Sequence, residues 1–183
     1  ILGATGVAGH IAIQNAEALG AEHVIAVARN ATALESLAAA GRTLVALEHG
    51  REATIAALDT AFSAHRPSVV LDFLWAEPAE TVLAAFQRSG VDADDHPVTY
   101  IEIGEAAGPT ASIPATLLRS TAITFRGSGA GSANVKKIME QIPVFAARIA
   151  DGTVLVPVKT YPLADIATAW QDTTPGRRIV LTP

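Results

Sequence analysis

A glycine-rich segment near the beginning of the chain constrains the fold more than any other feature. Residues 3–9 read GATGVAG, after a short apolar run and before a stretch with apolar residues at helical spacing. A glycine turn between a strand and a helix is the setting in which such a pattern indicates a dinucleotide-binding loop. Ala4, Gly6 and Gly9 occupy the three positions of the GxGxxG pattern. The alternative is a glycine turn that binds no ligand.

The segments after this loop predict a mostly parallel sheet. Short β-branched runs alternate with helical patterns, which is typical of βαβ units. We expect a doubly wound α/β sheet of the Rossmann type with helices on both faces, its strands at residues 1–2, 24–28, 43–47, 68–73, 98–103 and 122–125. The last crossover helix has an apolar stripe from Val135 to Ile149, and Pro143 is expected to kink or restart it.

The pattern changes near Gly152, where this helix is expected to end. Residues 154–160 predict a strand, 163–171 a short helix and 178–182 a final strand, and this tail does not continue the earlier rhythm. We therefore predict a nucleotide-binding domain over residues 1–152 and a strand-helix-strand tail over 153–183. The polar, acidic residues 89–97 predict a solvated loop.

Composition excludes several classes of function. The net charge of -5 comes without a basic cluster, which disfavours nucleic-acid binding. No apolar run approaches the roughly 20 residues of a membrane span, and no basic leader opens the chain, so we expect a cytoplasmic protein without a membrane partner. Cysteine is absent and the five histidines lack ligand spacing, so we expect no metal site. No catalytic residue can be assigned, since neither Tyr100 nor Tyr161 has a lysine four positions on.

The glycine loop predicts where a pyrophosphate would bind. Gly6 lets backbone approach the ligand, and Gly9 permits close packing of the following helix. The free N–H groups of Val7 and Ala8 and the positive end of the helix dipole supply anion binding without a lysine. The predicted cofactor contacts in the loop are Ala4, Thr5, Gly6, Val7, Ala8 and Gly9.

The end of the second strand predicts the choice of cofactor. Proteins specific for NAD carry an acidic residue there, which accepts from the ribose 2'-hydroxyl. This chain has Arg29, followed by Asn30. A guanidinium matches a phosphate with two donors, so the pair favours the 2'-phosphate of NADP(H). The alternative is a solvated Arg29 and an Asn30 that caps the next helix.

Further contacts are expected beyond the carboxyl ends of the parallel strands, where ligands of such sheets bind. Trp75 either covers the nicotinamide ribose or packs in the core, and the glycines after the strand at 122–125 either approach the nicotinamide or form a flexible loop. The predicted contacts at these ends are Leu74, Trp75, Ile103, Gly104, Gly127 and Ser128.

These motifs together resemble the cofactor-binding part of the medium-chain dehydrogenase/reductases, on the side of the quinone oxidoreductases and zinc-type alcohol dehydrogenases. GATGVAG resembles their cofactor loop, VIAVARN their NADP-binding second strand, and YPLADIATAW with GRRIVLTP their C-terminal signature. The resemblance implies hydride transfer between NADPH and a carbonyl, enone or quinone. It also implies that the tail rejoins a catalytic domain located upstream of the glycine loop in a longer protein, so that the fragment alone is inactive.

Two other functions fit parts of the pattern. One is an atypical short-chain dehydrogenase, and the other is a non-catalytic module that senses NADP(H) or binds a partner protein. For the favoured function we expect a small-molecule substrate as partner. The resemblance also implies a homodimer that forms through the sheet edge at 122–125, where an exposed apolar edge strand would invite pairing.

Overall fold

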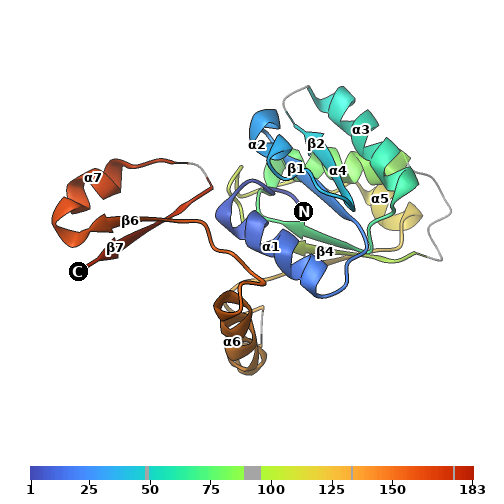
Figure 1. The fold of residues 1–183 in the computed structure, drawn as a ribbon. Helices are drawn as coiled ribbons and strands as arrows, with labels where there is room; N and C mark the ends of the chain where they lie inside the picture. The colour runs from blue at the N-terminus through green and yellow to red at the C-terminus, as the bar shows by residue number, and fades with distance from the viewer. Residues whose placement is uncertain (48–49, 89–95, 133, 175) are drawn as a thin grey trace.

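The structure is a computed structural model that describes residues 1–47, 50–88, 96–132, 134–174 and 176–183. Its main body is an α/β unit, and a smaller strand-helix-strand tail lies to one side (Figure 1). Most of the expected loop at 89–97 lies outside the described residues. The strands of the main body are β1 Val24–Ala28, β2 Arg42–Ala46, β3 Val69–Asp72, β4 Val98–Glu102 and β5 Ile123–Gly127. Its helices are α1 Val7–Ala18, α2 Ala31–Glu35, α3 Arg51–Ala64, α4 Ala76–Arg88, α5 Ala115–Ser120 and α6 Val135–Ala150.

The main sheet is parallel throughout its described pairs, and a very short strand joins its two halves. β1 pairs with β2, and β4 lies between β3 and β5. Leu2 bridges Val27 of β1 and Asp72 of β3, so the expected first strand survives as one bridging residue. The resulting order is β2, β1, the Leu2 segment, β3, β4, β5, which is the doubly wound order of dinucleotide-binding sheets.

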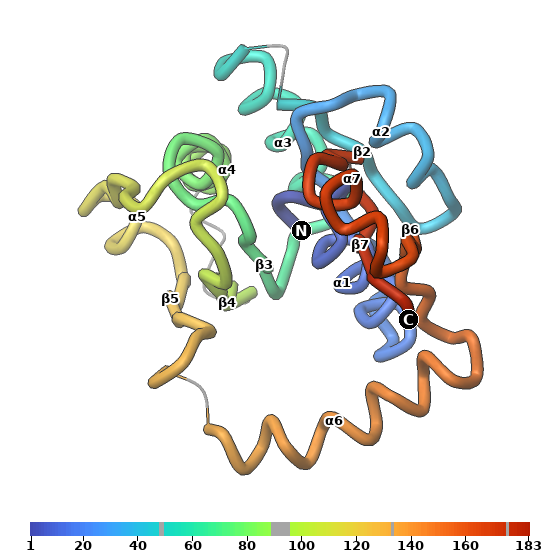
Figure 2. The backbone as a smooth tube through the Cα atoms, turned by 90° about the vertical axis from the view of Figure 1, so that its left-hand side faces the viewer, coloured from blue at the N-terminus to red at the C-terminus, as the bar shows by residue number. Residues whose placement is uncertain are grey.

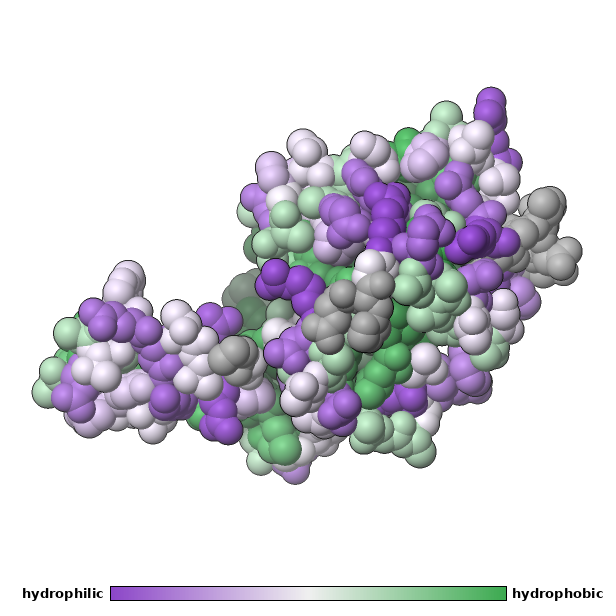
Figure 3. Space-filling model, turned by 90° about the horizontal axis from the view of Figure 1, so that it is seen from above, coloured by the Kyte–Doolittle hydropathy of each residue, from purple (hydrophilic) through white to green (hydrophobic). Residues whose placement is uncertain are grey.

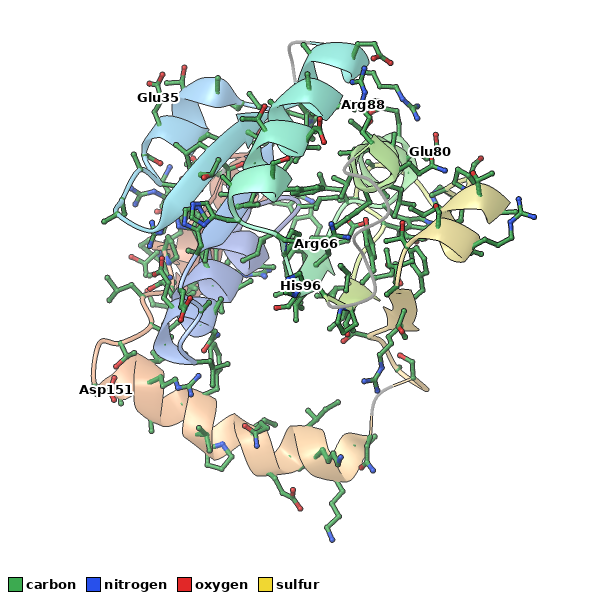
Figure 4. The ribbon with its side chains drawn as sticks, turned by 90° about the vertical axis from the view of Figure 1, so that its right-hand side faces the viewer. Glu35, Arg66, Glu80, Arg88, His96 and Asp151 are labelled. Atoms are coloured by element: carbon green, nitrogen blue, oxygen red, sulfur yellow. The ribbon has the colours of Figure 1, made fainter. Side chains whose placement is uncertain are left out.

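Alternation along β1 sends its side chains to two separate cores. Ile25 and Val27 face the core formed with α3, α4 and α5, while Val24, Ala26 and Ala28 face the core formed with α1 and α2. All five residues of β1 are buried, which explains why its sequence is continuously apolar. The predicted fold, with helices on both faces of a parallel sheet, is therefore confirmed. Figure 4 looks onto the amino ends of the strands, where Arg66 and His96 precede β3 and β4.

A buried carboxylate organises the end of β3. Asp72 is fully buried; its Oδ1 accepts from the backbone N–H groups of Leu74 and Trp75 at 2.8 and 3.0 Å, and its Oδ2 accepts from the Tyr100 hydroxyl at 2.7 Å. Burial, together with the charges of Asp72 and Glu102, raises the pKa of Tyr100, so the hydroxyl remains a donor. The network fixes the turn that leads from β3 into α4.

Helix α6 differs from the other long helices because none of its residues is buried. Two residues of its apolar stripe show this: Val135 is 70% exposed and Ile138 is 47% exposed. The helix runs apart from the strands (Figure 2), and its last turn is attached to α1 by the Arg148 guanidinium, which donates to Asn15 Oδ1 at 2.9 Å. The helix also continues through Pro143. Of the two expected effects of Pro143, the restart is therefore wrong and the kink stays a prediction.

The tail forms a sheet of its own. β6 Val158–Pro162 and β7 Arg178–Thr182 pair in parallel, and η1 Leu163–Asp165 and α7 Ile166–Gln171 lie between them in the chain. The predicted strand-helix-strand tail is therefore confirmed. The first tail strand was expected at 154–160 but begins at Val158. The reason is that Val154 N–H donates to the Arg148 carbonyl and Leu155 N–H to Gln14 Oε1, so these residues bind the main body instead. Figure 3 shows the tail projecting from the main body. No described helix is long and apolar enough to cross a bilayer.

The Asp72 network gives a prediction for stability. Tyr100→Phe removes the hydroxyl from the buried carboxylate, and we expect a loss of about 1–3 kcal/mol in the free energy of unfolding. The tail offers a matched control, because the Tyr161 hydroxyl also donates to a carboxylate, Asp172, at 2.6 Å, but at a partly buried position. Tyr161→Phe should cost less. Urea unfolding of both variants checks this, and equal losses would show that burial of the pair is not what matters.

Candidate nucleotide-binding site

The glycine loop lies at the carboxyl ends of β1 and β3. Gly3 makes the turn, with φ +80°, and its N–H donates to the Val27 carbonyl. Ala4, at the first position of the GxGxxG pattern, was expected to stand at the first turn position, but it is fully buried. The left-handed conformation of the turn falls instead on Gly3, where no Cβ obstructs it. Gly6 N–H donates to the Gly3 carbonyl at 3.0 Å and closes the loop.

The two later glycines have different roles. A Cβ built on Gly9 would lie 2.2 Å from the Gly3 carbonyl oxygen and 2.7 Å from Ala4 Cα, so α1 can pack on the loop only with glycine there. A Cβ on Gly6 would meet only the Gly3 oxygen, at 3.3 Å, and Gly6 is exposed. Gly9 therefore serves packing, and the open side of the loop lies at Gly6.

The start of α1 presents unpaired donors. The helix begins at Val7 without a side-chain cap, and no described residue accepts from the N–H of Val7 or Ala8. Ala8 is exposed beside Gly6. Two free N–H groups and the positive helix end form an arrangement that binds an oxyanion such as a pyrophosphate.

Arg29 and Asn30 follow β1 at the same edge of the sheet. Asn30 caps α2, because its Oδ1 accepts from Ala33 N–H at 2.9 Å, so the structural alternative for this residue is realised. Arg29 is exposed, and its side chain forms no hydrogen bond or ion pair within the described part of the chain. Its guanidinium is thus available to a ligand that approaches the end of β1.

The remaining predicted contacts come together beyond β3, β4 and β5. The N–H groups of Ile103 and Gly104 donate to the Asp72 carbonyl at 2.8 and 3.2 Å, and Ser128 N–H donates to the Glu102 carbonyl at 2.8 Å. These N–H groups are therefore already paired. Trp75 packs against the core and also lines a cavity that Gly127 borders. The expected packing in the core is therefore observed in part, and the contact with a nicotinamide ribose stays a prediction.

Leu74 and Gly176 reach the glycine loop from distant parts of the chain. The Leu74 side chain lies against Gly3, where an added Cβ would be 3.2 Å from Leu74 Cδ2. A Cβ on Gly176, in the turn before β7, would lie 3.1 Å from the Thr5 carbonyl oxygen, and the exposed Arg177 follows. Sequence reasoning missed this contact, because 171 positions separate Thr5 from Gly176.

Histidines and acidic groups do not form a metal centre within the described residues, which contain no cluster of three or more such side chains. His23 and His65 stack with ring centroids 3.6 Å apart, before β1 and after α3. Partial burial, and then the neighbouring His65, lowers the pKa of His23. This pair lies at the amino ends of the strands, away from the glycine loop.

Comparison with known proteins agrees with this geometry. No protein-family model matches the chain. The chain is 27% identical over 195 residues to the probable NADPH-dependent quinone reductase tdiC of Emericella nidulans, covering 100% of this chain and 53% of that protein. It is 20% identical to the structure of Escherichia coli quinone oxidoreductase complexed with NADPH, with a TM-score of 0.71 over 98% of this chain and 55% of that one. It is 22% identical to an alcohol dehydrogenase from Aeropyrum pernix, with a TM-score of 0.65 over 98% of this chain and 48% of that one.

The predicted resemblance is confirmed at the level of the fold. The chain is similar in sequence to a quinone reductase, and it shares its fold with about half of the chain of solved quinone oxidoreductases and alcohol dehydrogenases. It spans about half the length of the relatives that it matches.

The two glycines give a matched prediction. Gly9→Ala should destabilise the protein by about 1–3 kcal/mol or more, because the new methyl group overlaps backbone atoms that cannot rotate away. Gly6→Ala should leave the melting temperature nearly unchanged. Thermal unfolding followed by circular dichroism measures both. A Gly9→Ala protein that melts with the parent would show that α1 can move away from the loop at little cost.

Proposed function

We propose that this chain binds NADP(H) and is the nucleotide-binding part of an oxidoreductase that transfers hydride between NADPH and a carbonyl, enone or quinone. The tail, residues 153–183, would then join the catalytic part of a longer protein, which would supply the catalytic residues. The chain alone would bind the cofactor without turnover. The names of the related proteins, which include an NADPH-dependent quinone reductase, support this choice of chemistry.

One observation carries the proposal: unpaired donors for two phosphate groups lie at one edge of the sheet. The free N–H groups at the start of α1 suit the pyrophosphate, and Arg29 follows the neighbouring strand without a described acceptor. The groups fit NADP(H) better than NAD(H), because Arg29 cannot accept from a ribose hydroxyl. When bound, the cofactor would supply the hydride, and this chain would orient it.

Cofactor preference tests the proposal directly. The parent should bind NADPH more tightly than NADH by about one to two decades, the size of a charge-assisted contact of about 1.5–3 kcal/mol. Arg29→Asp should reverse the preference, since a carboxylate repels the 2'-phosphate and accepts from the free 2'-hydroxyl. Raised salt should weaken NADPH binding more than NADH binding. Calorimetric titration at two ionic strengths measures these constants.

The control is Arg119→Asp, which makes the same charge change at an exposed position on α5. It should leave the preference intact. If the parent binds NADPH and NADH with equal affinity, Arg29 does not contact the 2'-phosphate and the assignment to NADP(H) is wrong. Hydride transfer needs a second assay, on a protein that includes the catalytic part. There, a fall in NADPH absorbance in the presence of a quinone, enone or aldehyde would measure the transfer. The alternative, a sensing module, would bind the cofactor without turnover even there.

We also propose that the protein forms a homodimer through β5. This strand is the last in the order of the main sheet, so its outer backbone faces no described strand. Thr124→Asp would place two like charges across a two-fold axis between paired β5 strands, and we expect at least a tenfold weaker dimer. Sedimentation equilibrium of the parent and the variant measures this. A parent that stays monomeric at high concentration would exclude the pairing.

A further inference from the structure

The main sheet has a second edge, at β2, and a cavity of about 410 Å³ opens beside it. β2 lies between α2 and α3 and contacts both helices, which cover opposite faces of the sheet (Figure 1). The cavity is therefore a groove that has β2 at its base and one helix on each side. All the residues that line it, except Glu35, are alanine, valine or leucine.

The outer side of β2 carries backbone groups without partners. Val24 N–H of β1 donates to the Gly41 carbonyl just before β2, and this bond fixes which groups of β2 face β1. Because the backbone groups of a strand alternate between its two sides, those of residues 43 and 45 point to β1, and those of Leu44 and Ala46 point outward. Within the described chain, nothing pairs with the N–H or carbonyl of Leu44 or with the N–H of Ala46.

This edge remains open to a further strand. The Ala46 carbonyl accepts only a long hydrogen bond, from the Thr54 hydroxyl at 3.3 Å. Proteins commonly block such an edge with a charged side chain, a proline or a bulge. The only charged residue of β2 is Arg42, and its guanidinium is already bound to the Glu17 carboxylate on α1 at 2.6 and 2.8 Å. Free donors and acceptors on β2 can therefore pair with the main chain of a ligand.

The two sides of the groove leave room for the side chains of an added strand. Ala53 and Ala57 of α3 line one side; both are exposed and lie one helical turn apart. Ala31 and the buried Leu34 of α2 line the other side. A strand laid along β2 would direct alternate side chains toward α2 and toward α3. Both sides are apolar, so they favour apolar side chains on such a strand.

Charge narrows the choice of ligand further. Glu35 is exposed on α2 (Figure 4), and it is the one charged residue that lines the groove. Its carboxylate forms no ion pair within the described part of the chain. A lysine or arginine next to the apolar part of the ligand would pair with it. The net charge of -5 adds to this attraction for a basic segment.

We propose that the groove binds an extended segment of a partner protein, which adds to the sheet as a strand beside β2. The segment has apolar side chains and a lysine or arginine next to them. Main-chain hydrogen bonds to Leu44 and Ala46 supply part of the affinity, and the two apolar sides and Glu35 supply the selectivity. This assignment does not depend on cofactor binding.

Peptide titration tests the assignment. The probe is a capped, fluorescein-labelled hexapeptide of four valines with a lysine at each end, and fluorescence anisotropy reports binding. One comparison peptide has glutamates in place of the lysines. The other is N-methylated at its valines, so it keeps the side chains but loses the donors. We expect the parent to bind the probe at least about tenfold more tightly than either comparison peptide. Failure to bind the probe, or equal affinity for the N-methylated peptide, would overturn the proposal.

Two alanine variants of α3 locate the binding site. Ala57→Leu fills the groove with a larger side chain, and we expect at least a tenfold loss of affinity for the probe. Ala56→Leu is the matched control, because this neighbouring alanine is also exposed but does not line the groove; it should bind as the parent does. Melting temperatures of both variants verify that they are folded. An Ala57→Leu protein that binds the probe like the parent would contradict the assignment.

Amide hydrogen exchange, followed by NMR, reports strand pairing directly. In the free protein the amides of Leu44 and Ala46 should exchange faster than those of residues 43 and 45, which bond to β1. Saturation with the probe should slow the exchange of Leu44 and Ala46 at least about tenfold and leave the other two unchanged. A bound probe that leaves the exchange of Leu44 and Ala46 unaltered would place the peptide elsewhere on the protein.

Two other occupants of the groove would give different results. If a second copy of this chain occupies it, Ala57→Leu weakens self-association in sedimentation equilibrium, and a partner protein is excluded. If the groove belongs to the cofactor site, saturating NADPH displaces the probe, which would also overturn the proposal. We expect neither result, and Arg29→Asp should bind the probe as the parent does. A protein that binds the probe but no cofactor would contradict the proposed function alone.

Discussion

The two halves of the main sheet depend on the hydrogen bonds of one very short strand. Leu2 N–H donates to the Leu71 carbonyl at 2.9 Å, and Val27 N–H donates to the Ile1 carbonyl at 2.9 Å, so this segment is paired on both sides. Leu2 is 2% exposed and packs with the strands that it joins. The glycine loop begins at the next residue, and its position at the centre of the sheet follows from this pairing.

From that centre, unpaired donors lie along one edge of the sheet. Toward β1, the unpaired N–H groups at the start of α1 and the exposed Arg29 suit anions. On the other side of the centre, buried Asp72 fixes the turn after β3 that carries Trp75.

Apolar residues recur at helical spacing in both α4 and α6, but this spacing does not determine what surrounds each helix. Phe86 of α4 is 1% exposed, whereas Ile142 of α6 is 50% exposed, although both belong to apolar stripes of a helix. A stripe shows which face of a helix can be buried and says nothing of what is available to cover it. Arg148 of α6 donates to Asn15 of α1, while the helix itself runs apart from the strands (Figure 2).

The sequence by itself determined the features that depend on neighbouring residues. These are the strand–glycine–helix order of the loop, the alternation of β1 between two cores, and the cap of α2 by Asn30. The tertiary structure alone decided features that depend on distant residues: which glycine carries the positive φ, how Tyr100 meets Asp72, and where Gly176 meets Thr5. The physical reason is the separation along the chain between the residues that interact. Backbone propensity and residue spacing act over a few residues. Packing and buried hydrogen bonds join distant segments that come together only once the sheet has formed.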